Sequence, residues 1–405
     1  MSELACRREL FSLPAGLHYL NCAYMAPLPV VAQEAGLAGI RAKANPSAIT
    51  ARDFFDESDR ARALFGQLIG GDTGRVAIIP SVSYAVATAA RNCPTKAGQN
   101  VVVLDEQFPS NVLAWQRLCR ERELELRTVR APASRNRGEA WNAELLTAID
   151  AATAVVALPP AHWTDGTRFD LEAVGRRTRE TGALFFIDGT QSIGAAAFDV
   201  SRVNADAVAC AGYKWLLGPY SVGLAWYGPR FDDGVPLEEG WIARERSEDF
   251  RRLVDYPAAY QPGAVRYDVG ERSNFILIPM LNAALEVVLD LGPERIQRYC
   301  AAITRVAVEE ARALGFSVED AAWRSAHLFG LRAPEGVDLD GLRATLADRN
   351  VHVSLRGSAV RVAPHVYNDV ADLGALVDAL RAAVSGAGTA PASPSDPRAA
   401  SSPAR

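Results

Sequence analysis

The middle of the chain repeats one pattern, and this repeat limits the possible folds more than any other feature. A short run of apolar, often β-branched residues is followed by a turn of small or polar residues and then by a stretch with helical spacing. The apolar runs span residues 76–80, 100–104, 154–158, 183–187, 207–210 and 223–227. Nearly continuous runs are typical of strands covered on both faces. The repeat therefore predicts an α/β fold with a mostly parallel sheet and crossover helices after Ser83, Asn111, Leu171 and Asp188.

The pattern changes from about Pro279 onward. Long helices are predicted over 280–291 and 294–314, followed by short strands around Leu328 and Val351, which indicates a smaller α+β domain. We expect an N-terminal segment (1–30) packed near that small domain (279–384), and a large domain (31–278). Residues 385–405 are rich in Ser, Gly, Ala and Pro, which predicts a disordered tail.

Composition excludes several classes of protein. The 43 basic and 48 acidic residues give a net charge of -5 and form no blocks, so neither a nucleic acid nor an anionic membrane is an expected partner. The six cysteines have no disulfide-type or metal-type spacing, so we expect free thiols and no metal site. No signal-peptide pattern is visible, and no apolar stretch approaches the roughly 18 residues of a membrane span. We expect a cytoplasmic protein acting on a small molecule.

Two predicted strands each deliver a charged residue into a turn of small residues. Asp188 lies in LFFIDGTQSIGA (184–195) and Lys214 in ACAGYKWLLGPYSVG (209–223). Ligands of open parallel sheets bind at the carboxyl ends of the strands, so both side chains are expected at one rim. The structural alternative is a buried ion pair or a pair of strand-end caps.

Pyridoxal 5'-phosphate (PLP) needs such a pair. A lysine amine holds its aldehyde as a Schiff base, and a carboxylate keeps its pyridine nitrogen protonated so that the ring accepts electrons. The chain has only three lysines among its 43 basic residues, yet Lys214 lies in this apolar segment. Arginine cannot form a reactive imine, so a lysine retained here favours PLP chemistry.

The motifs YKWLLGP, DGTQS, QFPSN and RVAPHVYN, taken together, resemble the class V aminotransferase family of fold-type I PLP enzymes. The resemblance covers roughly residues 15–383 and is nearest the kynureninase and isopenicillin N epimerase-like branch, which is related to cysteine desulfurases. It implies a seven-stranded, mostly parallel sheet in the large domain, PLP as cofactor and an amino acid as substrate. It also implies a homodimer with the active site at the subunit interface.

The resemblance assigns cofactor contacts residue by residue. Asp188 resembles the pyridinium partner, Gln191 the contact to the ring hydroxyl, and Tyr213 an aromatic phosphate contact. The segment before the predicted helix at residue 84 resembles the phosphate loop, which implies contacts from Ser81, Val82 and Ser83 at a helix N-terminus. Without the family, Ser83 is equally well explained as a helix N-cap.

Three aromatic residues follow the next two strands. Phe108 matches the position where kynureninase-like enzymes stack a ring on the cofactor, although it is also explained as ordinary core. His162 is a candidate general acid or base, and is as readily explained by positioning a hydroxyl or capping a turn. Trp163 is expected to line the substrate side of the site.

Four further residues are assigned to the substrate, and two to the neighbouring subunit. In the resembled branch the RVAP arginine grips the substrate α-carboxylate, so Arg361 is the first choice and Arg356, across a predicted hairpin turn, the second. Asn21 and Tyr24 match the N-terminal segment that passes the substrate pocket. The remaining pair is Ser273 and Asn274 in VGERSNF (269–275). This segment resembles a loop that reaches the phosphate bound in the neighbouring subunit, with Ser273 or Asn274 as the donor.

The predicted reaction is removal of the α-proton followed by a lyase step, either β-elimination, C–S cleavage or kynureninase-type cleavage. Aminotransfer and epimerisation remain alternatives. A persulfide-forming cysteine desulfurase is disfavoured because residues 352–368 contain no cysteine. A non-enzymatic protein of the same fold is the second class, which Asp188, Lys214 and Arg361 together argue against. A nucleotide-binding enzyme is the third, and no phosphate-loop fingerprint supports it.

Overall fold

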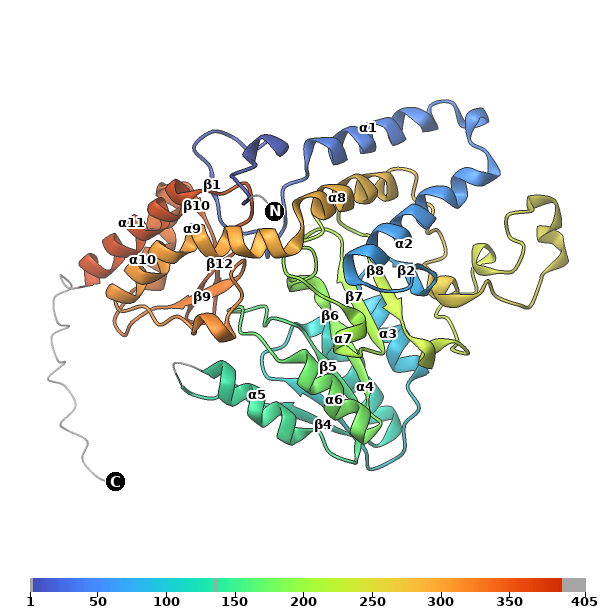
Figure 1. Cartoon of the computed structure of the whole chain (residues 1–405), viewed down its shortest axis with the longest axis horizontal. Coiled ribbons are helices and arrows are strands. Elements are labelled where there is room, and N and C mark those ends of the chain that lie inside the picture. The colour runs from blue at the N-terminus through green and yellow to red at the C-terminus, as the bar shows by residue number, and fades with distance from the viewer. Residues whose placement is uncertain (1–2, 135–136, 388–405) are drawn as a thin grey trace, which may run out of the picture.

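A central sheet organises the larger part of the molecule (Figure 1). The computed structural model describes residues 3–134 and 137–387, and its seven-stranded sheet has the order β2-β8-β7-β6-β5-β3-β4. Only β8 runs against its neighbours, so the predicted mostly parallel sheet is confirmed. The strands are β2 (Val76–Ile79), β3 (Asn100–Leu104), β4 (Glu125–Val129), β5 (Thr153–Leu158), β6 (Leu184–Asp188), β7 (Ala207–Ala211) and β8 (Gly223–Tyr227).

Helices cover both faces of this sheet, which explains the continuous apolar runs. In β3, Val101 and Val103 belong to one buried cluster, while Val102 and Leu104 belong to the cluster on the opposite face. Successive strand residues point to opposite faces, so a strand covered twice must be apolar at every position. The crossover helices are α3 (Val82–Asn92), α4 (Leu113–Arg122), α5 (Arg137–Ala148) and α6 (Leu171–Thr181).

Three helices pack together beside the sheet. Helix α8 (Leu277–Leu291) contacts both α1 (Val30–Lys43) and α2 (Asp56–Ile69). The approach to α1 is close, because a Cβ added to Gly39 would lie 2.3 Å from the Phe275 carbonyl oxygen. The expected domain boundary at residues 278 and 279 falls inside α8, so the division of the chain at that point stays a prediction.

The C-terminal part contains a second, antiparallel sheet with the order β11-β12-β9. Its strands are β9 (Phe329–Arg332), β11 (Ser354–Arg356) and β12 (Ala359–Val362), and its helices are α9 (Pro293–Ala313), α10 (Leu339–Asp348) and α11 (Val370–Ala387). The N-terminal strand β1 (His18–Tyr19) pairs with β10 (Val351–His352), so the first residues lie beside this part. The predicted disordered tail began at 385; α11 includes 385–387, and 388–405 lie outside the described residues.

One strand was missed from the sequence, and one predicted helix was wrong. Strand β4 was not predicted, because its residues are mostly half-buried or exposed at the edge of the sheet and give only a weak apolar signal. The helix expected after Asp188 is instead a 3₁₀ turn at Gly189–Gln191, followed later by the short α7 (Val200–Val203). Gly194, with φ of 101°, lies against the Trp215 carbonyl and turns the chain away from a helical path.

The loop after β5 is fixed to the C-terminal sheet. The amide of Gly330 donates to the Asp165 carbonyl (3.0 Å), and the amide of Ser325 donates to the Gly166 carbonyl (3.0 Å). A Cβ at Gly166 would lie 1.9 Å from the Leu328 carbonyl oxygen, so only glycine permits this approach. The loop therefore belongs structurally to both parts of the molecule.

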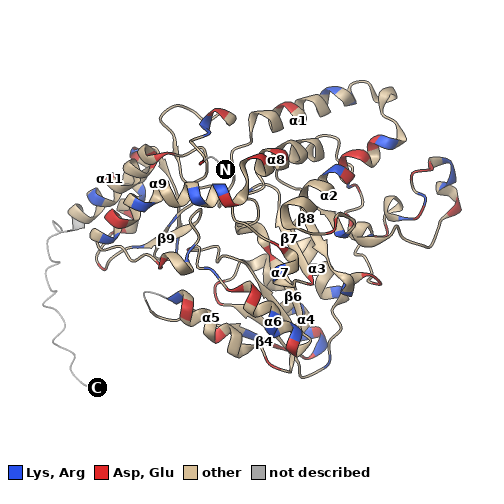
Figure 2. Ribbon diagram, viewed as in Figure 1, with Lys and Arg blue, Asp and Glu red and all other residues tan. Residues whose placement is uncertain are grey.

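The surface and the thiols agree with the composition. Basic and acidic side chains are interspersed along the ribbon (Figure 2). The six cysteines are all free thiols. Over residues 3–134 and 137–387, no helix combines the length and the apolar character needed to cross a membrane.

Candidate active site

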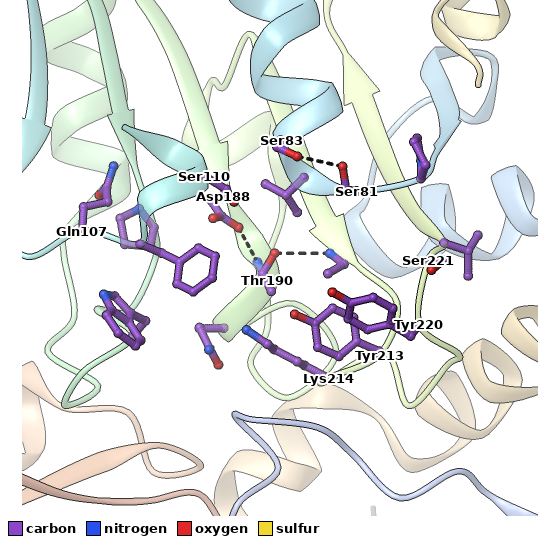
Figure 3. Close-up of a pocket in the computed structure, with 18 residues that line it drawn as sticks. Ser81, Ser83, Gln107, Ser110, Asp188, Thr190, Tyr213, Lys214, Tyr220 and Ser221 are labelled. Carbon is purple, nitrogen blue, oxygen red and sulfur yellow. Dashed lines mark hydrogen bonds between the residues drawn. The ribbon is translucent and has the colours of Figure 1, made fainter. Parts of the chain in front are cut away.

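A cavity of about 240 Å³ lies at the carboxyl-terminal edge of the large sheet. Asp188 at the end of β6, Lys214 after β7 and Phe108 after β3 all line it, as do residues 81–83 at the start of α3. Figure 3 shows Asp188 and Lys214 reaching this cavity from two different elements. The structure therefore brings together most of the cofactor contacts predicted from the sequence.

Lys214 is a buried amine that has no ion-pair partner within the described part of the chain. Its side chain belongs to a residue that is 6% exposed, and Nζ lies 5.2 Å from the centre of the Phe108 ring and 5.4 Å from that of Tyr213. Burial lowers the pKa of Lys214 to about 8, although the charge of Asp188 opposes this shift. A fraction of the amine is therefore neutral near pH 7, as attack on an aldehyde requires.

Asp188 is a buried carboxyl group that faces the same cavity. One of its oxygens accepts a hydrogen bond from the Thr190 amide (3.0 Å), and burial raises its pKa. No salt bridge joins Asp188 to Lys214 in the described residues, so the two groups are not the ion pair of the structural alternative, whereas Asp188 does cap the 3₁₀ turn at Gly189–Gln191 as the other form of that alternative expected. A protonated ring nitrogen placed beside Asp188 would supply the missing positive partner.

Helix α3 presents its N-terminus to the cavity. Ser81, not Ser83, is the N-cap: its Oγ accepts from the Tyr84 amide (3.3 Å) and lies 2.8 Å from the Ser83 Oγ (Figure 3). Ser81 and Ser83 are exposed toward the opening, while Val82 is buried. Hydroxyls and amides at the positive end of a helix suit a phosphate dianion. Residues 81–83 therefore fit the phosphate of PLP.

Two more side chains are fixed at the cavity wall. The Gln191 amide nitrogen donates to the Ala23 carbonyl (3.1 Å), and its oxygen accepts from the Trp215 indole (2.9 Å). This leaves one N–H of Gln191 for a ligand oxygen. Tyr213 also lines the cavity, and burial raises the pKa of its hydroxyl to about 12, so it is a neutral hydrogen-bond donor at pH 7.

His162 does not reach the cavity. Its Nδ1 is bonded to the Thr164 hydroxyl (2.7 Å) and its Nε2 to the Asp105 carbonyl (3.0 Å), and the residue is fully buried. Burial lowers the pKa of His162 to about 4, so the ring is neutral at pH 7. The geometry therefore favours the alternative in which His162 positions a hydroxyl, and not the alternative in which it is a general acid or base.

Trp163, the next residue, lines the cavity. Its indole nitrogen donates to the Glu106 carbonyl (2.6 Å), and its ring meets Phe108 edge-on at 5.4 Å. The backbone hydrogen bonds that fix the loop after β5 also fix the position of this ring.

Arg361 lies behind Trp163 on β12. It is 1% exposed, and its guanidinium donates to the Trp163 carbonyl (3.0 Å) and the Ser354 hydroxyl (3.4 Å). No carboxylate pairs with Arg361 in the described residues, and burial lowers its pKa to about 9. Arg356 on β11 is half-buried. The Cζ atoms of Arg361 and Arg356 lie 6.0 Å and 5.4 Å from the Trp163 ring centre.

Neither Arg356 nor Arg361 is among the residues that line the cavity, and the remaining predicted residues also lie outside it in one chain. Asn21 accepts a hydrogen bond from Ser354 (2.9 Å) and so supports the arginine-bearing hairpin, while Tyr24 is 57% exposed. Ser273 donates to the Phe54 carbonyl, and Asn274 caps α8 by accepting from the Leu277 amide (2.9 Å). A role for Ser273 or Asn274 at a phosphate stays a prediction that requires a second subunit.

Sequence reasoning missed several lining residues. Thr190 follows Asp188 by two positions, and its Oγ1 accepts from the Ala211 amide (3.2 Å), which ties the ends of β6 and β7 together. The others are Pro80, Gln107, Ser110, Pro159, Ala211, Tyr220, Ser221 and Val222. Pro80, Gln107, Ser110 and Pro159 follow parallel strands, which was a usable signal, since the carboxyl ends of such strands meet at one edge. Tyr220, Ser221 and Val222 instead precede the antiparallel β8, whose direction was not predicted.

Comparisons with known proteins agree with this geometry. The profile of the family described as aminotransferase class-V matches residues 41–385. An isopenicillin N epimerase of Streptomyces clavuligerus is 27% identical over 381 residues, covering 90% of this chain and 94% of that protein. A kynureninase of Pseudomonas fluorescens is 28% identical over 323 residues, covering 76% and 73%.

A solved structure has the same fold. A lysine-to-alanine mutant of C-DES, with glycine covalently linked to its PLP cofactor, superposes with a TM-score of 0.81 at 19% identity and covers 92% of this chain and 98% of that one. The fold-type I architecture expected from the sequence is thereby confirmed. With this fold, the matched family and a site that fits the cofactor, the chain belongs to the aminotransferase class-V family and is a PLP-dependent enzyme.

Proposed function

We propose that this enzyme is a lyase that cleaves a bond at the β-carbon of a small amino acid, by β-elimination, C–S cleavage or kynureninase-type cleavage. One observation carries the proposal: Lys214 is the single amine among the described cavity-lining residues, and the ring nearest to it, Phe108, cannot exchange a proton. Among the described lining residues, Lys214 is therefore the group that we assign to removal of the α-proton. A lyase can work with that group alone. Unlike an aminotransferase, it needs no second substrate to complete its reaction.

The chain's own residues divide the work around the cofactor. Bound PLP supplies an electron sink for negative charge at the substrate α-carbon. Asp188, whose carboxyl is buried, would hold a proton at the pyridine nitrogen of bound PLP. Lys214 would hold the cofactor through its amine and, as the buried amine of the cavity, would move the α-proton of the substrate. Gln191 orients the ring from its fixed position between Ala23 and Trp215.

The residues around the cavity also argue against the reaction of a persulfide-forming cysteine desulfurase. A persulfide-forming desulfurase needs a cysteine thiol that reaches the substrate sulfur. Among the described residues that line the cavity there is no cysteine, and burial raises the pKa of the nearby Cys22 and Cys210 thiols well above the ordinary value. The geometry therefore favours a lyase that releases its sulfur or carbon fragment directly.

Epimerisation is the second candidate. The epimerase relative covers 90% of this chain, and the Tyr213 hydroxyl lines the same cavity as Lys214. Inversion at the α-carbon needs a proton donor as well as a base, and the neutral Tyr213 hydroxyl is a candidate donor in the same cavity. Product analysis separates the candidates: a lyase gives pyruvate or another fragment, an epimerase the opposite enantiomer, and an aminotransferase a keto acid with the carbon skeleton intact.

We also propose that the enzyme is a homodimer with its active site at the subunit interface. Support comes from α1, where Leu37 and Ile40 are 50% and 55% exposed and, being three positions apart, lie on the same side of the helix. Light scattering after size exclusion is expected to give twice the mass of one chain. A monomer at micromolar concentration would contradict the proposal.

Replacing Lys214 tests the assignment of the cofactor. The wild-type enzyme should show the absorbance of lysine-bound PLP near about 420 nm. Lys214→Ala should abolish both this band and all turnover. Lys96→Ala, which removes a surface lysine far along the chain, is the control and should keep both. Persistence of the band in pure Lys214→Ala would refute the assignment.

A further inference from the structure

The two arginines beside Trp163 share one face of a hairpin. In the register of β11 and β12, Ser354 pairs with Arg361, and Arg356 pairs with Ala359. Residues two apart on a strand point to the same side, so Ser354, Arg356 and Arg361 face the same way. Arg356 and Arg361 occupy diagonal positions, which lie roughly 7–8 Å apart in an antiparallel pair. Their guanidinium groups converge on the same indole ring.

Neither arginine has an anion to neutralise it. Over the described ranges, no salt bridge involves Arg356 or Arg361, and the Nε of each is buried without a hydrogen-bond partner. Arg356 donates only to the carbonyl of its neighbour Leu355 (2.7 Å). The charge of Arg356 lowers the pKa of Arg361 further, which means that the two cations repel each other across a partly buried space. Unpaired buried cations are costly, and an anionic ligand offsets that cost.

Charge balance indicates how many anions the site takes. On the cofactor side, Asp188 would balance the pyridinium nitrogen of bound PLP, and the positive end of α3 would hold its phosphate. The substrate amine carries no negative charge, so it cannot neutralise either arginine. The remaining excess consists of two guanidinium groups. A single α-carboxylate neutralises only one of them, and a second negative group on the substrate neutralises the other.

We propose that the substrate is an acidic amino acid, whose α-carboxylate binds Arg361 and whose side-chain carboxylate or equivalent acid binds Arg356. This inference rests on the proposed function of the cavity and deepens it by naming the substrate class. Trp163 forms the shared wall: its ring keeps both guanidinium planes in place by cation–π contact.

Calorimetry on the PLP-loaded enzyme tests the proposal without turnover. The probes are dicarboxylates without an amine, succinate and glutarate, against the monocarboxylates butyrate and pentanoate of matched length. The second carboxylate adds a charge-assisted hydrogen-bonded pair with Arg356. Each dicarboxylate should therefore bind at least about tenfold more tightly than the monocarboxylate of the same length at low ionic strength. Arg356→Gln should remove this advantage and leave monocarboxylate binding unchanged, whereas Arg361→Gln should weaken binding of both.

Matched variants distinguish binding of a carboxylate by the Arg356 guanidinium from general electrostatic attraction to a positive charge. Arg349→Gln removes one charge from an exposed position at the end of α10 and should change neither affinity. Arg356→Lys keeps the charge but loses the planar fork, so it should retain only part of the dicarboxylate preference.

Two results would overturn the inference. One is equal binding of the two classes of probe by the wild type. The other is an equal loss of both in Arg356→Gln, which would mean that the two arginines share one carboxylate. A normal cofactor spectrum alongside either result leaves the proposed function standing. Loss of the spectrum in the wild type would instead defeat the proposed function itself.

Discussion

The two sides of the cavity are built in opposite ways. On the cofactor side, Asp188, Gln191 and Ser81 each hold a hydrogen bond from the chain itself before any ligand arrives. On the substrate side, Arg356 and Arg361 lie against Trp163 without lining the cavity themselves, and they carry charges that no described residue neutralises. The cofactor side is therefore preorganised for a cofactor that stays bound. The substrate side reaches charge balance only when a substrate binds. Substitutions on the first side should therefore affect rate constants, and those on the second should affect binding constants.

Asp188→Asn is expected to give the largest effect among variants that still bind PLP. An amide cannot hold the ring proton, so kcat/KM should fall by about 100-fold or more, the size of loss seen when a charge-stabilising group is removed. Steady-state kinetics measures this, and the visible spectrum checks that cofactor is bound.

Asp206→Asn is the matched control for Asp188. Asp206 is a largely buried carboxylate just before β7, at the opposite edge of the sheet, where it accepts from the Phe185 amide (2.8 Å) and burial raises its pKa. Its replacement should lower stability and leave kcat/KM unchanged. Near wild-type activity in Asp188→Asn would mean that the carboxylate does not serve the cofactor.

The rate at which the apoenzyme takes up PLP should depend on pH through Lys214. The pKa of this amine is lowered from 10.5 to about 8, so the neutral, reactive fraction rises about tenfold per pH unit below pH 8 and levels off above it. Stopped-flow absorbance measures the rate constant at each pH.

Substitutions on the two sides of the cavity should move this inflection in opposite directions. Arg361→Gln removes a repelling charge and shifts the inflection to higher pH, whereas Asp188→Asn removes an attracting charge and shifts it lower. An inflection at 10.5 in the wild type would show that burial does not perturb Lys214 in this way.

His162→Ala should have the smallest catalytic effect. The change leaves the Thr164 hydroxyl and the Asp105 carbonyl without their partner, so the free energy of unfolding at pH 7 should fall by about 1–3 kcal/mol, with kcat/KM unchanged. Urea denaturation measures the loss, and His352→Ala, at an exposed histidine, should cost little.

The pH dependence of stability gives a second measure of His162. Its pKa is depressed from 6.5 to about 4, so between these values the unfolded chain binds a proton that the folded chain does not. The stability contributed by the neutral ring is therefore lost as the pH falls through this window, and His162→Ala should flatten the fall. A loss of kcat with an altered pH–rate profile would instead return His162 to the catalytic residues.

The sheet and the Asp188–Lys214 pair were predictable because strand-end positions follow from chain order alone. The strand predictions at 100–104 and 223–227 coincide with β3 and β8. The direction of a side chain after a strand does not follow in this way. His162 and Trp163 are adjacent in one loop, yet one turns into the core and the other toward the cavity, since this loop is shaped by β9, which lies far along the chain.

The glycine at position 166 has a mechanical consequence. Because its backbone rests directly on Leu328, the indole of Trp163 and the hairpin bearing Arg361 are parts of one rigid piece. The same loop is also held to the segment after β3, since the Trp163 indole donates to the Glu106 carbonyl and the His162 ring bonds the Asp105 carbonyl. Any displacement of the C-terminal sheet relative to the large sheet would therefore have to break these hydrogen bonds, so the loop fixes the distance between the two parts of the molecule.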